Sequence, residues 1–269
     1  MSILQAFLLG VLQGIAEFLP ISSSGHLAIA KHLFGLEEIP LAYDVLLHVA
    51  TLLAVVLFFR KQIADLFKVL FRWIFRKTEV ADTPKRKMII AVILGTIVTG
   101  VIGIATSKLI PDLPVKYICI GFIITSVLLV ASSRFSAYLI EKKGTDITVS
   151  PVKGLIIGLA QGLGTLPGIS RSGTTISASL FCGIDRNVAG EYSFILSIPA
   201  VLGAFILEAK DLGEVTSSVG IVPLIVGFFA AFVSGIFALK FLIKLINKGK
   251  LEYFAFYLIP VAVLGLIFF

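Results

Sequence analysis

The chain has 269 residues, of which 58% are hydrophobic and 14% are charged, and its formal net charge is +7. Soluble domains average roughly 45–50% apolar and about 25% charged residues, so the composition excludes an ordinary soluble globular domain. Apolar runs recur along the whole chain, which excludes a protein with a single membrane anchor. The cations cluster in a few connections, which argues against a nucleic-acid-binding surface.

Long apolar runs predict six membrane-spanning helices, each near the roughly 20 residues that cross a bilayer core. The predicted spans are 42–60, 87–107, 115–135, 188–208, 220–243 and 251–269. Two further apolar regions, near 3–35 and 152–183, are interrupted in the middle by Gly, Pro and Ser residues. Because Pro and Gly break helices, we expect neither region to be one continuous helix.

The two interrupted regions share a polar pattern. The first reads Gly10-x-x-Gln13-Gly14-x-x-Glu17-Phe-Leu-Pro20-Ile-Ser22-Ser23-Ser24-Gly25-His26, and the second reads Gly158-x-x-Gln161-Gly162-x-x-Thr165-Leu-Pro167-Gly-Ile-Ser170-Arg171-Ser172-Gly173. Six of these residues recur at a constant offset of 148 positions, and only the proline slips by one. We therefore predict one membrane domain, 1–269, that contains an internal repeat of 1–140 and 150–269.

Each predicted copy holds one broken hairpin and three spans, and an odd number of spans turns the second copy upside down. The expected fold is therefore an all-α polytopic membrane protein. It would hold six transmembrane helices and two re-entrant helical hairpins in an inverted-topology repeat. In such a repeat the site is expected near the midplane, where the two tips meet. Irregular backbone at that depth is tolerated only inside protein or beside a wet cavity.

The basic residues predict the orientation. Of the 23 lysines and arginines, 18 fall in 60–87, 134–153, at Arg186, or in 240–250, and the predicted spans put all of these on one side. Cations concentrate on cytoplasmic loops, so this side is expected to be cytoplasmic. Lys108, Lys116 and Lys210 fall in the opposite connections. The chain is then expected to be a multi-pass protein of the plasma membrane, with both termini on the outer side.

Few ionisable residues lie at membrane depth, where each is costly and is a candidate for function. They are Glu17, His26, Asp44, His48, Arg171 and Glu191. Three of them, Glu17, His26 and Arg171, belong to the repeated polar segments. For Asp44, His48 and Glu191 we expect a structural or supporting role.

Arg171 is predicted to open a half-helix and to form an anion site. Backbone N–H groups at a helix start, hydroxyls and a guanidinium are all suited to binding phosphate. The expected binding residues around it are Ser170, Ser172, Gly173, Thr174 and Thr175. The alternative is a structural ion pair between Arg171 and Glu17.

The serine cluster of the first segment suggests a nucleophile. Any one of Ser22, Ser23 and Ser24 could simply cap the half-helix, with Gly25 beside them, but three exceed what a cap requires. Ser23 and His26 are three residues apart and share a helix face, so a nucleophile–base pair is a hypothesis.

Gln13 and Glu17 also share a helix face, because they are four residues apart. Glu17 could accept a proton, orient His26 or hold a divalent cation. The alternative for Glu17 is a purely structural role, in which it neutralises the charge of Arg171.

The block from Gln13 to His26 and the block Pro167-Gly-Ile-Ser-Arg-Ser-Gly-Thr-Thr resemble the undecaprenyl-diphosphate phosphatase family of the bacitracin-resistance type, in order and spacing. The resemblance covers essentially the whole chain. It implies removal of the terminal phosphate of undecaprenyl diphosphate, at a site open to the outer face, to give the carrier used in cell-envelope synthesis. The functional positions it implies are Glu17, Ser23, His26, Ser170, Arg171 and Thr175, with Gln13 in support.

On this interpretation Arg171 clamps the diphosphate, Ser23 attacks, His26 is the acid–base and Glu17 orients it. Attack by water that Glu17 or His26 activates stays open as an alternative. Mg²⁺ or Ca²⁺ is the cofactor left open, although no spacing of His, Asp or Glu fixes a metal site. The expected partners are a polyprenyl diphosphate and membrane lipids, with no nucleic acid, and a homodimer is the assembly left open.

Two other classes compete with this hypothesis. A transporter or flippase of polyprenyl phosphate lipids would also use inverted repeats and broken helices, and a fold alone does not decide function. Lipid phosphatases of the acid-phosphatase type use similar Ser-Gly-His and Ser-Arg runs but need a later histidine. No histidine follows Arg171 in this chain.

Overall fold

The computed structural model describes all residues except 37, 110–113, 210–214 and 216–217, and Lys210 therefore lies outside it. In the described part the chain is helical. The helices are α1 (Ile3–Phe18), α2 (Ser23–Phe34), α3 (Leu41–Phe58), α4 (Arg60–Ile74), the 3₁₀ turn η1 (Val80–Asp82), α5 (Thr83–Leu109), α6 (Val115–Lys143), α7 (Pro151–Leu163), α8 (Arg171–Phe181), α9 (Arg186–Glu208), α11 (Ile221–Asn247) and α12 (Tyr253–Phe268).

Among the residues that the structure describes, five helices are long and apolar enough to cross a membrane: α3, α5, α6, α9 and α11. The chain is therefore an all-α, multi-pass membrane protein. The sixth predicted span, 251–269, is shorter than expected, because α12 has 16 residues. At 1.5 Å per residue it is about 24 Å long, less than the roughly 30 Å of a bilayer core.

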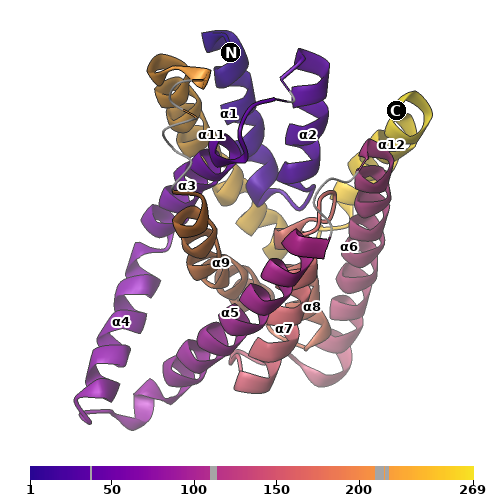
Figure 1. The fold of residues 1–269 in the computed structure, drawn as a ribbon. Helices are drawn as coiled ribbons and strands as arrows, with labels where there is room; N and C mark the ends of the chain where they lie inside the picture. Colours follow the sequence, from indigo (N-terminus) through magenta and orange to yellow (C-terminus); the bar gives the residue numbers. More distant parts are fainter. Residues whose placement is uncertain (37, 110–113, 210–214, 216–217) are drawn as a thin grey trace.

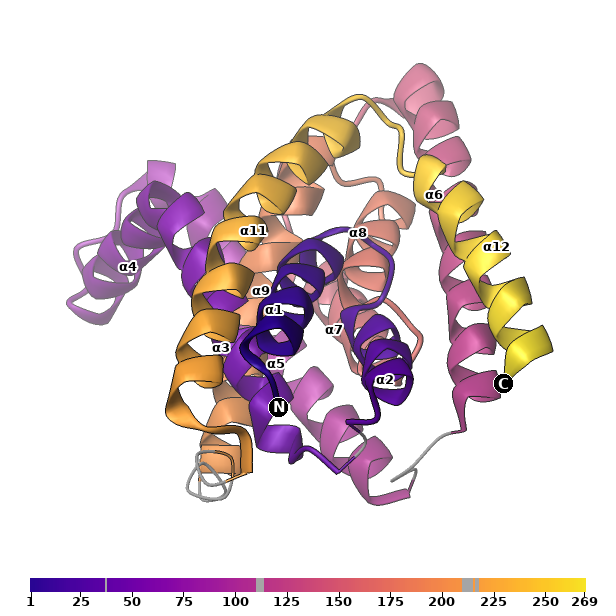
Figure 2. The ribbon, with the colours of Figure 1, turned by 90° about the horizontal axis from the view of Figure 1, so that it is seen from above.

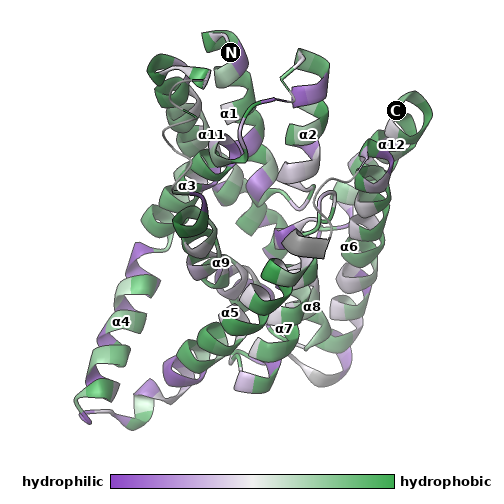
Figure 3. Cartoon of the chain, in the orientation of Figure 1, coloured by the Kyte–Doolittle hydropathy of each residue, from purple (hydrophilic) through white to green (hydrophobic). Residues whose placement is uncertain are grey.

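The connection 60–87 differs from the sequence prediction, which gave it no helix. Its first part forms α4, whose exposed apolar residues include Phe67 and Phe71 on one stripe, while Lys61 and Lys68 are exposed beside it. This mixture of cations and apolar residues has too low a mean hydropathy to read as a span, yet its spacing suits an amphipathic helix. Figure 3 shows hydrophilic residues on α4 and at the start of α5, whereas the long helices are mostly hydrophobic.

Both interrupted regions are broken where Gly, Pro and Ser gather. Helix α1 ends at Phe18 and α2 begins at Ser23, while α7 ends at Leu163 and α8 begins at Arg171. In Figure 1 the pair α1 and α2 lies in the half of the molecule that holds the N-terminus, and α7 and α8 lie in the opposite half. Figure 2 shows α1 and α2 surrounded by longer helices, among them α3, α5, α6 and α11.

Each broken pair packs on a long helix from the other half of the chain. Helix α1 lies along α11, and α7 lies along α5. Small residues allow this close approach, since a Cβ on Gly10 would collide with Gly227 and one on Gly158 would collide with Gly95. The breaks between the paired helices are thereby held at fixed places inside the bundle.

Candidate active site

The first break places Ser23 at the start of a helix. Ser22 has a positive φ of 70° and caps α2, and its Oγ accepts from the amide of Gly25 at 3.4 Å. The first helical residue is therefore Ser23, whose side chain leans back towards the end of α1 because helical Cβ atoms tilt towards the N-terminus. The prediction that one serine caps the half-helix applies to Ser22.

The second break places Arg171 in the corresponding position. Ser170 caps α8 and accepts from the amide of Gly173 at 3.1 Å, while its own amide donates to Thr125 Oγ1 on α6 at 3.0 Å. Gly168 has a φ of +88°, and any Cβ there would collide with the backbone of Ile118. The turn before Arg171 is thus fixed by a glycine that no other residue can replace without strain.

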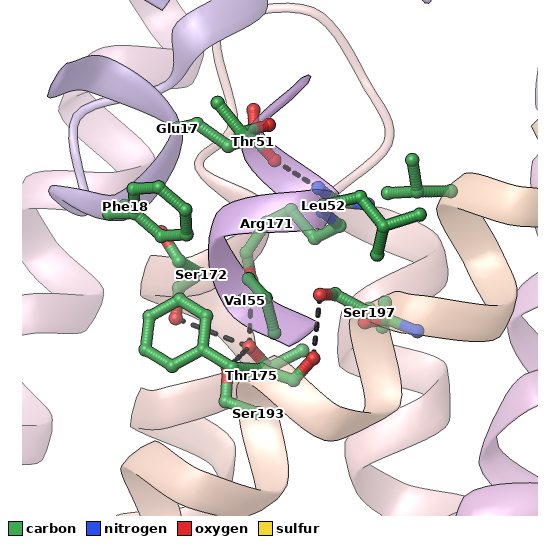
Figure 4. A pocket seen from close by; sticks show the side chains of 13 residues that line it. Glu17, Phe18, Thr51, Leu52, Val55, Arg171, Ser172, Thr175, Ser193 and Ser197 are labelled. Carbon is green, nitrogen blue, oxygen red and sulfur yellow. Dashed lines mark hydrogen bonds and ion pairs between the residues drawn. The ribbon is translucent and has the colours of Figure 1, made fainter. Parts of the chain in front are cut away.

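The Glu17 carboxylate joins the two breaks. Its Oε2 accepts from the Ser23 hydroxyl at 2.6 Å and from Gln13 Nε2 at 3.0 Å. Its Oε1 pairs with Nη2 of Arg171, which comes from the other half of the chain. Figure 4 shows Arg171 reaching towards the Glu17 carboxylate next to Thr51. The ion pair named as the alternative for Arg171 is therefore present, and it places Ser23 and Arg171 on the same carboxylate.

His48 is a fourth partner of Glu17. Its Nε2 lies 3.2 Å from Glu17 Oε2, and its Nδ1 lies 2.7 Å from the carbonyl oxygen of Asp44. The sequence suggested a structural or supporting role for His48, but gave no sign of this contact across 31 positions. Asp44 points elsewhere and accepts from Lys31 Nζ at 2.7 Å.

His26 does not pair with Ser23 in the structure, contrary to the hypothesis of a nucleophile–base pair. Its Nδ1 lies 2.9 Å from the carbonyl of Ser22, and its Nε2 lies 2.9 Å from the hydroxyl of Tyr257 on α12. Its ring also packs against Phe122 at 5.0 Å between centroids. Glu17, which was expected to orient His26, contacts Ser23 instead. The hydroxyl of Ser23 faces back to α1, while the imidazole of His26 faces α6 and α12.

The other predicted binding residues lie at the same two helix starts, although several hydroxyls are engaged locally. Ser24 contacts the Ser22 hydroxyl at 3.4 Å, and Ser172 contacts that of Ser170 at 3.2 Å. Thr174 and Thr175 both donate to the carbonyl of Arg171 at 2.9 Å.

Thr175 is also hydrogen-bonded to Ser193 on α9, a residue that the sequence did not single out. Gly25 and Gly173 supply the capping amides. The missed residues, Ser193 and Tyr257, belong to helices that carry no polar motif, so no local signal could have found them.

A pocket next to Glu17 and Arg171 is lined by both polar and apolar side chains (Figure 4). Its polar lining is Glu17, Thr51, Gln161, Arg171, Ser172, Thr175, Ser193 and Ser197. Its apolar lining is Phe18, Leu52, Val55, Phe194 and Val201. The Oε1 atom of Gln161 is buried and has no hydrogen-bond partner among the described residues, so it can accept from a bound molecule.

Among the described residues no group of three or more His, Cys, Asp and Glu comes together as metal ligands would. Cationic and amide donors contact both oxygens of Glu17, which is the arrangement of an ion-pair network.

Comparisons with known proteins agree with the resemblance seen in the motifs. A protein of Treponema denticola named undecaprenyl-diphosphatase is 54% identical over 266 residues, which cover 99% of this chain and 97% of that protein. Proteins of the same name from Carboxydothermus hydrogenoformans and Borreliella burgdorferi are 38% and 39% identical, over 96% and 98% of this chain and 94% and 97% of their own lengths. The sequence model of the family described as bacitracin resistance protein BacA matches residues 6–264. The chain therefore belongs to the bacitracin resistance protein BacA family.

Proposed function

We propose that the chain is an integral-membrane phosphatase that hydrolyses undecaprenyl diphosphate to the monophosphate and phosphate. This reaction recycles the lipid carrier for cell-envelope synthesis. The names of the relatives support the proposal, since all three relatives described above are called undecaprenyl-diphosphatase. The observation that carries it is the single Glu17 carboxylate that binds the Ser23 hydroxyl on one oxygen and Arg171 on the other.

Phosphoryl transfer needs an aligned nucleophile and positive charge on the transferred group more than it needs covalent assistance. Arg171 can supply the charge, because its guanidinium forms paired hydrogen bonds with phosphate oxygens. The starts of α2 and α8 add N–H groups that have no partner within their helices. Both helix starts carry Ser and Gly, so phosphate oxygens can approach the backbone closely.

The reaction proceeds in two steps on this site. Ser23 Oγ bonds to the terminal phosphorus while its proton passes to Glu17, and the bond from that phosphorus to the bridging oxygen breaks. Undecaprenyl phosphate leaves with the electron pair and takes the proton from Glu17. Water then bonds to the phosphorus of the phosphoserine, the bond from phosphorus to Ser23 Oγ breaks, one water proton passes through Glu17 to that Oγ, and phosphate is released. Glu17 suits the role of general base because 2.6 Å separates it from the hydroxyl that it must deprotonate.

His26 has a different role in this scheme from the acid–base predicted from the sequence. It holds the Ser22 carbonyl and Tyr257, and so fixes the strained residue that precedes the nucleophile. Direct attack by water remains the second route. In that route Glu17 deprotonates the water, and Ser23 only orients it.

We further propose that the protein is an inverted repeat of 1–140 and 150–269, with α1–α2 and α7–α8 as re-entrant hairpins. The reciprocal packing of α1 on α11 and of α7 on α5 supports this two-fold arrangement. Both termini lie towards one end of the molecule, and the connection between α4 and α5 lies at the other (Figure 1). That connection is rich in cations, so we assign it to the cytoplasm. Both termini then lie outside the plasma membrane, and the site opens to the outer face.

The diphosphate takes the polar residues of the pocket lining, and the apolar prenyl chain stays in contact with lipid. Mg²⁺ or Ca²⁺ is a proposed aid, because a divalent cation would neutralise the phosphate oxygens that Arg171 leaves free. A homodimer is the proposed assembly, and the mass of the purified protein in detergent tests it.

The activity is tested by incubating the purified protein in detergent with undecaprenyl diphosphate, with and without Mg²⁺ or Ca²⁺, and measuring released phosphate. We expect saturable release by the wild-type chain and a large loss in Arg171→Ala. An absence of release from folded wild-type protein under every cation condition would contradict the proposed function.

A further inference from the structure

We propose that His48 is a positioning residue for the reaction: it donates a hydrogen bond to Glu17 and keeps that carboxylate charged and aimed at Ser23. The inference rests on the proposed function, because it concerns the group that accepts the serine proton. No sequence motif includes His48, and its role follows from its contacts alone.

The hydrogen-bond roles of the imidazole are set by its two neighbours. The carbonyl oxygen of Asp44, 2.7 Å from Nδ1, can only accept, so Nδ1 carries a hydrogen. The carboxylate oxygen of Glu17, 3.2 Å from Nε2, also accepts. Both contacts are favourable together only if a proton lies between Nε2 and Oε2. With Glu17 ionised, His48 is then an imidazolium and donates from both nitrogens.

Glu17 therefore lies between two cationic side chains. Arg171 takes Oε1, while His48 and Ser23 share Oε2. A diphosphate will compete for the Arg171 guanidinium, which is the side chain suited to phosphate. The Asp44 carbonyl holds His48 at Nδ1, so Nε2 keeps one positive charge on the carboxylate when Arg171 turns to substrate.

The placement of His48 does not depend on either helix break. It lies in α3, a spanning helix that packs on α9 and α11. One turn further, Thr51 donates to the His48 carbonyl at 2.8 Å and lies beside Glu17 in Figure 4. The face of α3 that carries both residues is thus directed at the carboxylate, and His48 can hold Glu17 while the helix starts adjust to substrate.

A merely structural role would make His48 a link between α1 and α3. Its removal would then lower stability or substrate affinity without a selective effect on the chemical step. A positioning role predicts a lower kcat at nearly constant KM, and it predicts that the effect disappears once Glu17 is no longer a base.

The experiment compares His48→Leu and His48→Gln with the wild-type chain in the phosphate-release assay. Leucine removes the hydrogen bond, whereas the glutamine amide can still donate one to Glu17 without a charge. We expect kcat to fall about 10- to 100-fold in His48→Leu, the range typical of residues that orient a catalytic group. We expect His48→Gln to recover part of that loss, with KM changed less than about threefold in both. His32→Gln is the matched control, since it makes the same change at an exposed histidine of α2.

A double-mutant cycle with Glu17→Gln completes the test. If His48 acts through Glu17, either His48 substitution leaves the residual rate of Glu17→Gln unchanged. The His48→Gln arm keeps the cycle usable if His48→Leu fails to fold, which thermal unfolding in detergent reports. Wild-type kcat in His48→Leu, or losses that add fully in the cycle, would overturn the inference. A wild-type chain without activity would instead overturn the proposed function.

Discussion

Replacing Glu17 by Gln separates the two functions that the structure gives this carboxylate. As a base, Glu17 takes the proton of Ser23, which lies 2.6 Å away. As a counter-ion, it pairs with Arg171. Glutamine keeps the shape of the side chain but loses both the charge and the basicity. Loss of the base should lower kcat, whereas loss of the counter-ion should free Arg171 for substrate and should not raise KM.

The geometry predicts which way the new amide turns. Oε2 accepts from Ser23 and Gln13 and faces His48, whereas Oε1 pairs with Arg171 alone. An NH₂ group at the Oε2 position would face three donors, but at the Oε1 position it faces only one. The amide nitrogen is therefore expected at Oε1, where it releases Arg171 from its ion pair and leaves the guanidinium available for diphosphate.

The expected result is a large fall in kcat without a rise in KM. A lost general base typically costs about 10²- to 10⁴-fold in rate, which is about 3–5 kcal/mol of transition-state stabilisation at 1.36 kcal/mol per factor of ten. The released Arg171 should hold KM at or below the wild-type value. Saturation curves of phosphate release from undecaprenyl diphosphate measure both constants.

Glu191→Gln is the control, because it makes the same change at a half-buried carboxylate of α9 outside the pocket lining. A Glu17→Gln protein with wild-type kcat would refute the reasoning and leave Glu17 only the role of neutralising Arg171. A raised KM with unchanged kcat would also refute it, since that pattern marks a residue that only binds substrate.

Four further predictions each concern a single residue. Arg171→Ala should lower kcat/KM by about 10³- to 10⁵-fold, as for other arginines that stabilise phosphoryl transfer, and Arg171→Lys should recover only part because it lacks the planar fork; phosphate release by the folded variants checks this. Ser23→Ala should abolish any phosphoserine trapped by acid quench, and retention of more than about a tenth of kcat would assign attack to water. Gly14→Ala should destabilise the protein by about 1–3 kcal/mol, because the added Cβ would collide with Ser234 and the backbone of α11. Gly100→Ala should not destabilise it, since a Cβ at Gly100 would meet nothing within 4 Å. The unfolding midpoints of the two variants in detergent compare these effects. A hydrogen bond from Lys153 and two from Thr148 lower the pKa of Asp146 to about 2, below its ordinary 3.8. The stabilisation of the fold by ionised Asp146 is therefore present above about pH 4 and is lost as the pH falls towards 2. The difference in unfolding midpoint between wild type and Asp146→Asn should shrink over that interval.

Local sequence patterns predicted the breaks and their residues. Gly, Pro and Ser residues place the chain outside helical geometry at Ser22 and before Arg171, and the capping hydroxyls follow from ordinary helix-start chemistry. The spacing of Gln13 and Glu17 likewise predicted a shared face, and their side chains are hydrogen-bonded. These features depend on a few neighbouring residues, so a single sequence contains them.

Contacts between distant helices could not be predicted in the same way. His48 meets Glu17, and Tyr257 meets His26 across 231 positions, because of how whole helices pack. The pairing of Ser23 with His26 failed for a local reason. The rule for residues three apart assumes the interior of a helix, whereas Ser23 is the first helical residue and leans towards the preceding α1.

The packing of α1 along α11 has a consequence for how the protein is made. Helix α1 is made before α11, and the helix that covers its glycine face is complete only after roughly 230 further residues, or about 12–46 s at about 5–20 residues per second. Helix α7 has no such delay, because α5 precedes it in the chain. The nascent chain therefore holds α1 in the translocon or in lipid, without its packing partner, until α11 has been made.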